Sequence, residues 1–333
     1  MPKAPTLETV AERARVSRQT VSNVLNAPER VLPETRERVL EAIARLGYRP
    51  NRAARALVTR RSGTVGVLAS GSALFGPSST LVAVEVAARD AGFFVSVATV
   101  ARWEAEPVAG ALDHFLDEGV DGVVVIAAHD EAVAAVRGFG GPVPVVMVGP
   151  AGLPEPLTTV SMDQRAGAAL AVRHLVDLGH REVVHLAGPL DWLDARRRIE
   201  GWRDALTAAG LPAGEPVPGD WSAETGYRVG RRLVREGLPT AVFAANDQLA
   251  LGLLHAFAEA GVRVPDDVSV AGFDDIDGAA HFFPPLTTVR QEFGALGRGC
   301  MEVLRAAMAG EEPESRLVAP TLVMRASTGP PRA

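Results

Sequence analysis

The chain has 333 residues, 47% of them hydrophobic, a length that allows two or three domains with their own buried cores. It contains no run of about eighteen apolar residues and opens without a secretory apolar segment, which excludes a membrane protein and predicts a cytoplasmic one. The net charge is −6, but residues 1–61 hold thirteen Lys or Arg against six Asp or Glu. Only this basic head, at +7, is suited to binding phosphates, and the rest of the chain is acidic.

Residues 6–26 show the pattern of two short amphipathic helices joined by a tight turn, which is typical of a DNA-reading helix-turn-helix. Ser17 is placed to cap the second helix. An ordinary helical hairpin with a polar solvent face is the alternative, and the local positive charge favours DNA. The side chains that project from the first two turns of the second helix can reach base edges in the major groove; they are Arg18, Gln19, Ser22 and Asn23.

A third helix is predicted over residues 33–46, with Pro33 in its first turn and Gly47 as its stop signal. Its inward side chains are predicted to be Val39, Leu40, Ile43 and Leu46. The following stretch, 51–58, is helix-capable but too short to be stable alone, so we expect conditional structure there. A flexible basic linker is the other interpretation of this stretch.

From residue 64 onward the chain alternates apolar strands with amphipathic helices, which predicts parallel sheets covered on both faces. The pattern restarts after residues 160–163, so we expect two doubly wound lobes with a ligand cleft between them. The predicted strands are 64–69, 93–98, 121–127, 143–148, 182–187, 240–245 and 268–273, and predicted helices include 79–91, 163–178, 194–209, 223–236 and 247–260.

These patterns give an α/β protein in three parts. Residues 1–50 form a helix-turn-helix domain, 51–62 a hinge helix and linker, and 63–330 a two-lobed effector-binding and dimerisation domain. Lobe one takes about 63–161 and 291–320, and lobe two about 162–290 and 321–330. Cys300 has no partner for a disulfide or a zinc site and is expected to be a small core residue.

Polar groups stand at strand ends or helix starts of the second lobe, where they should face the crevice. They are Asn246-Asp247, Asp274-Asp275 and Arg198. An amide, a carboxylate and a guanidinium suit adjacent sugar hydroxyls, and Trp221 offers an aromatic face to a pyranose ring. Each also has a purely structural explanation, since such residues commonly form caps, turns or core.

Enzymatic activity is not expected. The chain lacks a Gly-x-Ser-x-Gly elbow, a Walker loop, a His-Glu-x-x-His motif and a correctly placed dinucleotide fingerprint, and no cofactor or metal is predicted. Asp274 and Asp275 are adjacent on a turn, so they diverge and do not bracket a glycosidic bond. A transport-type sugar receptor would need an export signal and no headpiece.

Six landmarks together give the chain a strong resemblance to the lac repressor family of bacterial transcription regulators, from Thr6 to about residue 328. They are Val-Ala-Glu, Val-Ser and Gln-Thr-Val-Ser within 10–22, Tyr48-x-Pro-Asn51, Leu186-Ala-Gly-Pro-Leu190, Gly219-Asp-Trp-Ser-Ala223, Ala245-Asn-Asp-Gln248 and Pro284-Pro-Leu-Thr-Thr288. The resemblance implies a periplasmic-binding-protein-like core with a sugar between its lobes, attached to a DNA-binding head.

The resemblance also implies roles in DNA binding. Arg18, Gln19 and Asn23 would read bases, and because two of them depart from the family's archetype, the operator should differ. Leu57 would wedge into the minor groove at the centre of the site from the hinge helix. Phosphate contacts or caps would come from Thr6, Ser17, Thr20, Ser22 and Asn26, and phosphate contacts beside the wedge from Asn51, Arg52, Arg55 and Arg60.

For the effector, the resemblance assigns hydroxyl contacts to Arg198, Asn246 and Asp274, stacking to Trp221 and Phe293, and first-lobe contacts to Ser70 and Gln291. Trp192 would add a second aromatic wall. Ile126 and Gly149 stand where the archetype has polar contacts, so a β-galactoside and another β-linked disaccharide such as cellobiose both fit. A purine or a phosphosugar stays open, although a phosphosugar would need a basic cleft and only Arg102 and Arg197 are candidates for it.

The expected protein is therefore a repressor of a sugar-utilisation operon, with activation as an alternative. Its expected partners are double-stranded operator DNA, a small sugar effector and a second copy of itself, with no membrane. Bound to DNA it would be associated with the nucleoid. We expect dimers, because no tetramer-forming heptad tail follows residues 324–326. Inducer would close the cleft, shift the first lobes apart and melt the hinge helices.

Overall fold

A computed structural model describes residues 5–48, 61–71, 73–127, 129–149 and 157–332. Contacts divide the chain into two compact units, residues 1–62 and 63–333. The predicted hinge helix, 51–58, lies within residues 49–60, which are outside the described residues, so it stays a prediction. Within the described part, no helix is long and apolar enough to cross a membrane.

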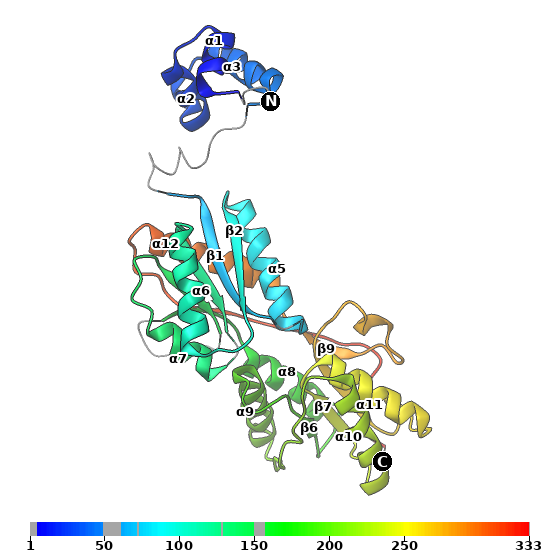
Figure 1. Cartoon of the computed structure of the whole chain (residues 1–333). Helices are drawn as coiled ribbons and strands as arrows, with labels where there is room; N and C mark the ends of the chain where they lie inside the picture. The colour runs from blue at the N-terminus through cyan, green and yellow to red at the C-terminus, as the bar shows by residue number, and fades with distance from the viewer. Residues whose placement is uncertain (1–4, 49–60, 72, 128, 150–156, 333) are drawn as a thin grey trace. The chain divides into compact units, whose positions relative to one another are not determined.

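The first unit is the three-helix headpiece that the sequence predicts (Figure 1). It consists of α1 (Leu7–Ala14), α2 (Arg18–Asn26), the 3-10 turn η1 (Pro28–Arg30) and α3 (Pro33–Leu46). Arg15 makes the tight turn between the first two helices with a left-handed backbone, φ 55°. The small core is formed by Val10, Ala11, Ala14, Val21, Val24, Val39, Ala42 and Tyr48.

One inward residue of α3 was predicted wrongly. Leu40 is 49% exposed, whereas Ala42 is buried. Successive residues of a helix are about 100° apart, so Val39, Ala42 and Ile43 share one stripe while Leu40 turns away from it.

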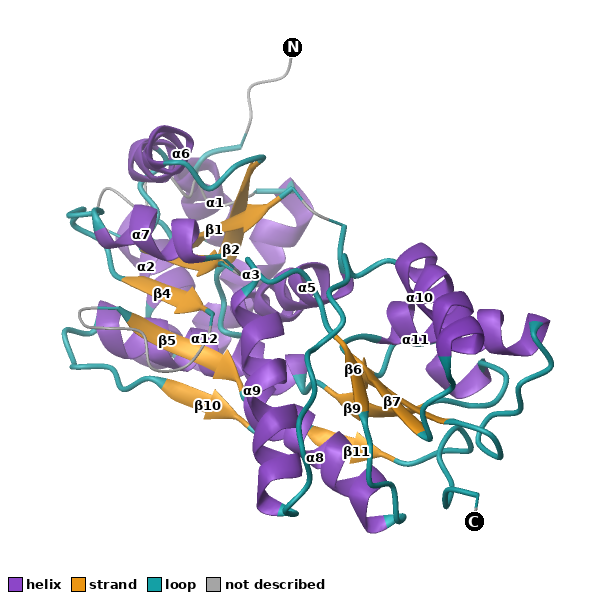
Figure 2. Cartoon of the chain, turned by 90° about the horizontal axis from the view of Figure 1, so that it is seen from below, coloured by secondary structure: helices purple, strands orange, loops and turns teal. Residues whose placement is uncertain are grey.

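Lobe one of the second unit is an all-parallel sheet in the order β10-β5-β4-β3-β1-β2 (Figure 2). Helices α5 (Phe75–Asp90) and α12 (Phe293–Met308) cover one face, and α6 (Ala105–Asp117) and α7 (Asp130–Arg137) cover the other. Its strands are β1 (Thr64–Ser70), β2 (Phe94–Val100), β3 (Gly122–Ile126), β4 (Val145–Val148), β5 (Thr158–Met162) and β10 (Arg316–Val318).

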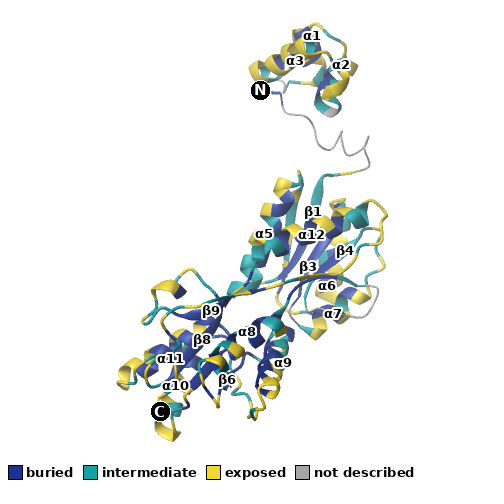
Figure 3. Ribbon diagram, turned by 180° about the vertical axis from the view of Figure 1, so that it is seen from behind, coloured by how far each residue is buried: buried dark blue, intermediate teal, exposed yellow. Residues whose placement is uncertain are grey.

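The alternation along β1 shows why both faces of this sheet are apolar. Val65 and Val67 pack into the cluster beneath α5 and α12, and Leu68 packs into the opposite cluster beneath α6 and α7. Figure 3 shows the buried strands between their helices. Cys300 of α12 is buried, and this burial raises the pKa of its thiol to about 12.

Lobe two repeats the arrangement with the strand order β11-β9-β8-β7-β6, in which only the pair of β11 and β9 is antiparallel. Helices α8 (Gln164–Asp177) and α9 (Leu193–Ala208) cover one face, and α10 (Ala223–Glu236) and α11 (Asp247–Glu259) the other. The strands are β6 (Val184–Leu186), β7 (Ala241–Ala244), β8 (Ser269–Asp274), β9 (Thr287–Arg290) and β11 (Thr321–Val323), and a 3-10 turn, η2 (Ala279–His281), follows β8.

The chain passes between the lobes at three places, from β5 into α8, from β9 into α12 and from β10 into β11. Each lobe is therefore assembled from separate stretches of sequence. These passages place the residues after β5 and β9 beside the cleft, which is where the polar groups of the site lie.

The closest helix packing in lobe two depends on glycine. A Cβ atom on Gly252 would lie 1.9 Å from the carbonyl oxygen of Ala223, and one on Gly226 would lie 2.1 Å from that of Leu249. Helices α10 and α11 thus meet backbone to backbone. Because α11 begins at the cleft, this contact also fixes one wall of the site.

We predict that Gly252→Ala lowers the free energy of unfolding by about 1–3 kcal/mol, because the added methyl group must push two backbones apart. Gly110→Ala is the matched control, since Gly110 lies in α6 with open space around its Cβ position. There alanine should stabilise the helix by about 0.5–1 kcal/mol. Urea unfolding of both variants measures the difference, and equal effects would contradict the packing argument.

Candidate DNA-binding face and effector cleft

The second helix of the headpiece carries a capped, polar N-terminal face. The Oγ atom of Ser17 accepts a hydrogen bond from the backbone N–H of Thr20 at 3.0 Å, so the predicted cap is present. Arg18 and Gln19 are exposed, and the Nε2 atom of Gln19 donates to Oδ1 of Asn23 at 3.0 Å. This bond aligns side chains one helical turn apart, so both amides face the same side.

The remaining DNA-binding predictions have different outcomes. Thr6 is exposed and caps α1 by accepting from the backbone of Thr9, which agrees with its capping role. Ser22 is half-buried on α2, and Asn26 is the last residue of that helix. The hinge residues lie outside the described residues, so their contacts stay predictions; they are Asn51, Arg52, Arg55, Leu57 and Arg60.

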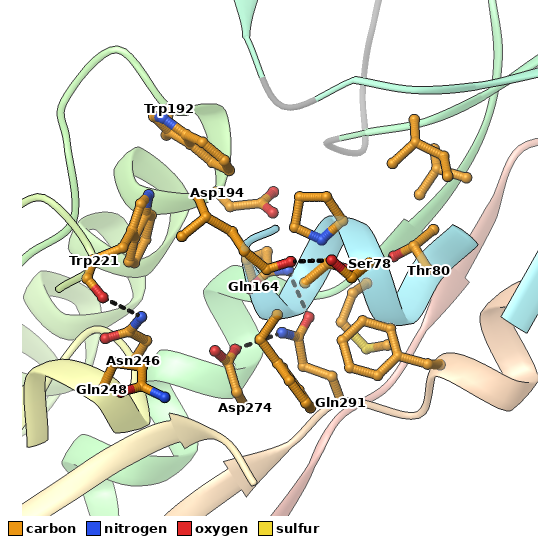
Figure 4. A pocket seen from close by; sticks show the side chains of 18 of the residues that line it. Ser78, Thr80, Gln164, Trp192, Asp194, Trp221, Asn246, Gln248, Asp274 and Gln291 are labelled. Carbon is orange, nitrogen blue, oxygen red and sulfur yellow. Dashed lines mark hydrogen bonds between the residues drawn. The ribbon is translucent and has the colours of Figure 1, made fainter. Parts of the chain in front are cut away.

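A cavity of about 600 Å³ lies between the two lobes (Figure 4). Of the eight predicted effector residues, only Ser70 does not line it; it ends β1 half-buried. Lobe one contributes the start of α5 and the ends of β3 and β4, including Ile126 and Gly149. The predicted residues that line the cavity are Trp192, Arg198, Trp221, Asn246, Asp274, Gln291 and Phe293.

Four side chains form a closed ring of polar contacts at the floor of the cavity. The Nε atom of Arg198 donates to Oε1 of Gln164 at 2.9 Å, and Nε2 of Gln164 donates to Oε1 of Gln291 at 3.0 Å. Gln291 in turn donates from Nε2 to Oδ1 of Asp274 at 2.7 Å, and that oxygen lies 3.7 Å from Nη2 of Arg198. Gln164 and Gln291 lie in two of the passages between the lobes, and the ring connects them to Arg198 and Asp274 of lobe two.

Arg198 is only 4% exposed, so its charge is satisfied from several sides. Besides the ring, Nη1 donates to the backbone oxygen of Ala245, and the guanidinium lies 3.8 Å from the centre of the Phe273 ring. Burial lowers the pKa of Arg198 and the nearby carboxylates oppose that shift. The group stays a fixed cation beside the cavity.

Trp221 is held in a strained but fully supported position. Its φ of 70° is unusual for a residue other than glycine, and Nδ2 of Asn246 donates to its carbonyl oxygen at 3.1 Å. The indole ring packs where a Cβ atom on Gly188 would lie, 2.2 Å from the ring, which explains the need for glycine there. Trp192 meets it edge to face at 5.7 Å, so two aromatic walls meet at one end of the cavity.

Asn246 shows that the structural and functional explanations are compatible. Its Oδ1 atom accepts a hydrogen bond from the backbone N–H of Leu249 at 2.8 Å, which caps α11. Its Nδ2 atom donates to the carbonyl oxygen of Trp221 and so positions that residue. The residue still lines the cavity. Asn246 therefore caps α11, as the alternative explanation from the sequence predicts, and also lines the cavity.

A second set of contacts joins the lobes at Trp192. The Nη2 atom of Arg196 donates to Oδ2 of Asp130 at 2.7 Å, and the rings of His129 and Trp192 meet edge to face at 4.6 Å. The backbones of His129 and Trp192 also form an antiparallel bridge. We name these four residues the clasp, since each pair joins lobe one to lobe two.

Comparison with known proteins decides the family. The model "Bacterial regulatory proteins, lacI family" matches residues 6–51, and "Periplasmic binding protein-like domain" matches residues 172–328. The chain is 37% identical over 328 residues to the lactose operon repressor of Escherichia coli (strain K12), covering 98% of this chain and 91% of the repressor. The chain belongs to the lacI family. It is a DNA-binding transcriptional repressor of that family.

Three further likenesses extend over nearly the whole chain. The regulator CelR of Thermobifida fusca is 38% identical over 340 residues, covering 98% of this chain and 99% of CelR. The solved lac repressor dimer bound to operator and the anti-inducer ONPF has a TM-score of 0.86 at 36% identity, covering 98% of this chain and all of that one. The CelR–cellobiose complex has a TM-score of 0.72 at 34% identity, covering 97% and 99%. These relatives are regulators, not enzymes.

The carboxylates of this lacI-family cleft differ in how they are satisfied. Burial raises the pKa of Asp274 to about 6, against the lowering effect of Arg198. Asp247, behind the cavity wall, accepts from Thr288 Oγ1 at 2.5 Å and from the N–H of Ile276, and burial raises its pKa to about 8. Asp275 turns away and pairs with Arg290 and Arg325, so the Asp-Asp pair diverges.

Sequence reasoning missed several cavity residues. Gln164 and Asp194 are the important ones, and each stands in the first turn of a helix that begins at the cleft. Position at a helix start after a strand was therefore a usable signal. Arg102 and Arg197, the residues considered for a phosphosugar, do not line the cavity. Polar residues that also line it are Ser78, Thr80, Ser222 and Gln248.

Proposed function

We propose that this lacI-family protein represses a sugar-utilisation operon and leaves its operator when a β-galactoside or another β-linked disaccharide binds between the lobes. The observation that carries the proposal is one cavity that combines two tryptophans with a ring of polar side chains. A disaccharide presents apolar ring faces and hydroxyl groups together, and this lining offers a partner for each.

The size of the cavity supports a ligand of this class. About 600 Å³ falls within the usual range of small-molecule sites. Ile126 and Gly149 contribute apolar or small surface on the lobe-one side, while most polar groups come from lobe two and the passages. A ligand can therefore stack against the tryptophans and direct its hydroxyls toward the ring.

Charge argues against a phosphosugar or another anionic effector. Among the described residues that line the cavity, Arg198 is the single cation, and it is already engaged by Gln164, Ala245 and Asp274. Two carboxylates, Asp194 and Asp274, share the lining with it. An uncharged sugar avoids repulsion that an anion would meet.

The relatives support both forms of the proposal. One is named a lactose operon repressor, and CelR has been solved in complex with cellobiose. A galactoside and a glucoside are thus equally good candidates for this chain. Repression is preferred to activation because the lac repressor likeness extends over the headpiece as well as the core.

The ligand would act by stabilising the closed cleft. Because its contacts would come from both lobes, a bound sugar would lower the free energy of the closed arrangement relative to the open one. A change in lobe position would pass to the hinge segment before β1 and so to the headpiece. Linkage requires that operator DNA weaken sugar binding by the same factor, with coupling energies typically about 1–3 kcal/mol.

An exposed apolar row supports a homodimer. Val82 and Val86 on α5 are 62% and 39% exposed, and Phe94 and Val97 on the adjacent edge strand β2 are 48% and 49% exposed. Val82 and Val86 lie one turn apart on α5, which packs beside β2, and exposed apolar side chains gathered on neighbouring elements are typical of an interface. A second copy of the chain would cover it and bring two headpieces to the two halves of a pseudo-palindromic operator.

The first prediction concerns DNA. Arg18→Ala should weaken binding to a fragment from upstream of its own gene by about 5- to 150-fold, the equivalent of the 1–3 kcal/mol of one base contact. Arg45→Ala is the control. This substitution removes the same charge from the headpiece, but Arg45 lies on α3, where it pairs with Glu41. Gel retardation at low salt measures both, and equal losses, or no retardation by the unaltered protein, would contradict the assignment.

The second prediction concerns pH. Cellobiose or lactose binding, measured by calorimetry, should be constant above pH 7 and weaken as the pH falls through about 6, where Asp274 becomes protonated. A sugar hydroxyl donates to the ionised carboxylate, so binding favours the charged form and is lost with it. The pKa of Asp194 is also raised, which acts in the same direction. Unchanged or tighter binding at pH 5, with the fold intact by circular dichroism, would be the contrary result.

The third prediction concerns assembly. Sedimentation should show dimers, and Val82→Asp should shift them toward monomers because it places a charge in the apolar row. Leu317→Asp is the matched control, since Leu317 is 54% exposed on β10, at the opposite edge of the same sheet. Tetramers, or dissociation by the control alone, would count against this interface.

A further inference from the structure

The carboxylates around the cleft can be sorted by whether the protein already satisfies them. Asp274 accepts from Gln291 and lies near Arg198, Asp247 accepts two hydrogen bonds, and Asp275 binds two arginines. Asp194 is different. Among the described residues, none donates a hydrogen bond to its carboxylate and no cationic nitrogen lies within 4.0 Å of it, although it lines the cavity.

Aromatic surface lies at the same end of the cavity. Trp192 and Trp221 meet edge to face at 5.7 Å, and both line the cavity. Figure 4 places Trp192, Trp221 and Asp194 around this end of the cavity. A sugar ring that packs against these indoles has its hydroxyl groups within the same part of the cavity as the Asp194 carboxylate.

We propose that Asp194 is the carboxylate that selects the ligand: it accepts a hydrogen bond from a sugar hydroxyl beside the Trp221 indole and excludes phosphorylated sugars by its charge. This inference rests on the proposed function. It assigns the main polar contact with the sugar to Asp194 ahead of Asp274. A sugar hydroxyl can donate to the carboxylate while the apolar face of the same ring packs against the indole, so one polyol uses both groups.

Burial also bears on the stability of the unliganded protein. It raises the pKa of Asp194, so the folded protein disfavours the charged form of this carboxylate relative to the unfolded chain. The shift has the same direction for Asp247 and Asp274, which accept hydrogen bonds, so the lack of a donor among the described residues is what sets Asp194 apart. An amide in place of this carboxylate should therefore not destabilise the unliganded protein.

The test compares Asp194→Asn with Asp191→Asn in the full-length protein. Asp191 is an exposed carboxylate three residues earlier, outside the cavity lining. With cellobiose and lactose as probes in calorimetry, Asp194→Asn should weaken binding at least tenfold, and Asp191→Asn should change it less than twofold. Without sugar, the thermal midpoint of Asp194→Asn should equal or exceed that of the unaltered protein.

A phosphorylated probe tests selectivity. Cellobiose carrying a 6-phosphate should not bind the unaltered protein. In Asp194→Asn, the ratio of the Kd for this phosphorylated sugar to the Kd for cellobiose should fall at least fivefold. Unchanged cellobiose binding by Asp194→Asn, or a fall in thermal midpoint together with affinity, would overturn this inference and leave the proposed function standing. Failure of the unaltered protein to bind any β-linked disaccharide would instead remove the proposed function itself.

Discussion

The cleft depends on the burial of one charge, the guanidinium of Arg198. A buried cation is tolerated only where hydrogen bonds and an opposite charge replace its hydration. Here the replacement comes from Gln164, Gln291 and Asp274 in a ring, with the Phe273 face beneath. Removal of any member would leave another buried polar group unpaired, so these side chains act as one unit.

This unit also explains the unusual backbone of the site. Asp274 has a φ of 112° and Trp221 a φ of 70°, conformations that cost about 1–3 kcal/mol each when a side chain is present. They persist because Gln291 and Asn246 hold them, and because Gly188 leaves room for the indole. Both Trp221 and Asp274 line the cavity, so the fold spends stability on a preformed site.

The features that could be predicted from the sequence are those that depend on residues close together in the chain. The helix-turn-helix and the strand-helix alternation were predictable because their apolar periods are local, and Ser17 as a cap depends on residues three apart. The bounds of the seven predicted strands differ from the structure by one or two residues, whereas β5, β9, β10 and β11 were not predicted. Leu40 was misassigned because its apolar side chain looks the same in the sequence whether it lies within the inward stripe or beside it.

The site was predictable only where motifs carried it. Arg198, Asn246 and Asp274 stood in recognisable motifs, whereas Gln164 and Asp194 gain their positions from the way distant stretches meet at the passages between lobes. Ser70 was assigned by the resemblance alone; it ends β1 outside the cavity lining, so its contact with an effector stays a prediction. Pairing between amides 127 residues apart, as in Gln164 and Gln291, has no local signature.

The two connections between the lobes differ in strength, and this difference sets the direction in which the cleft can open. The ring is buried and closed, so separation there would break several hydrogen bonds, each worth about 0.5–1.5 kcal/mol net, or about 1.5–3 kcal/mol where a charged group takes part. In the clasp, the side chains of Arg196 and Asp130 are 38% and 64% exposed, and a pair this accessible contributes at most about 1 kcal/mol. Water can replace it readily. The contacts at Trp192 therefore cost less to separate than the ring does, and we expect the cleft to open there first, past one aromatic wall.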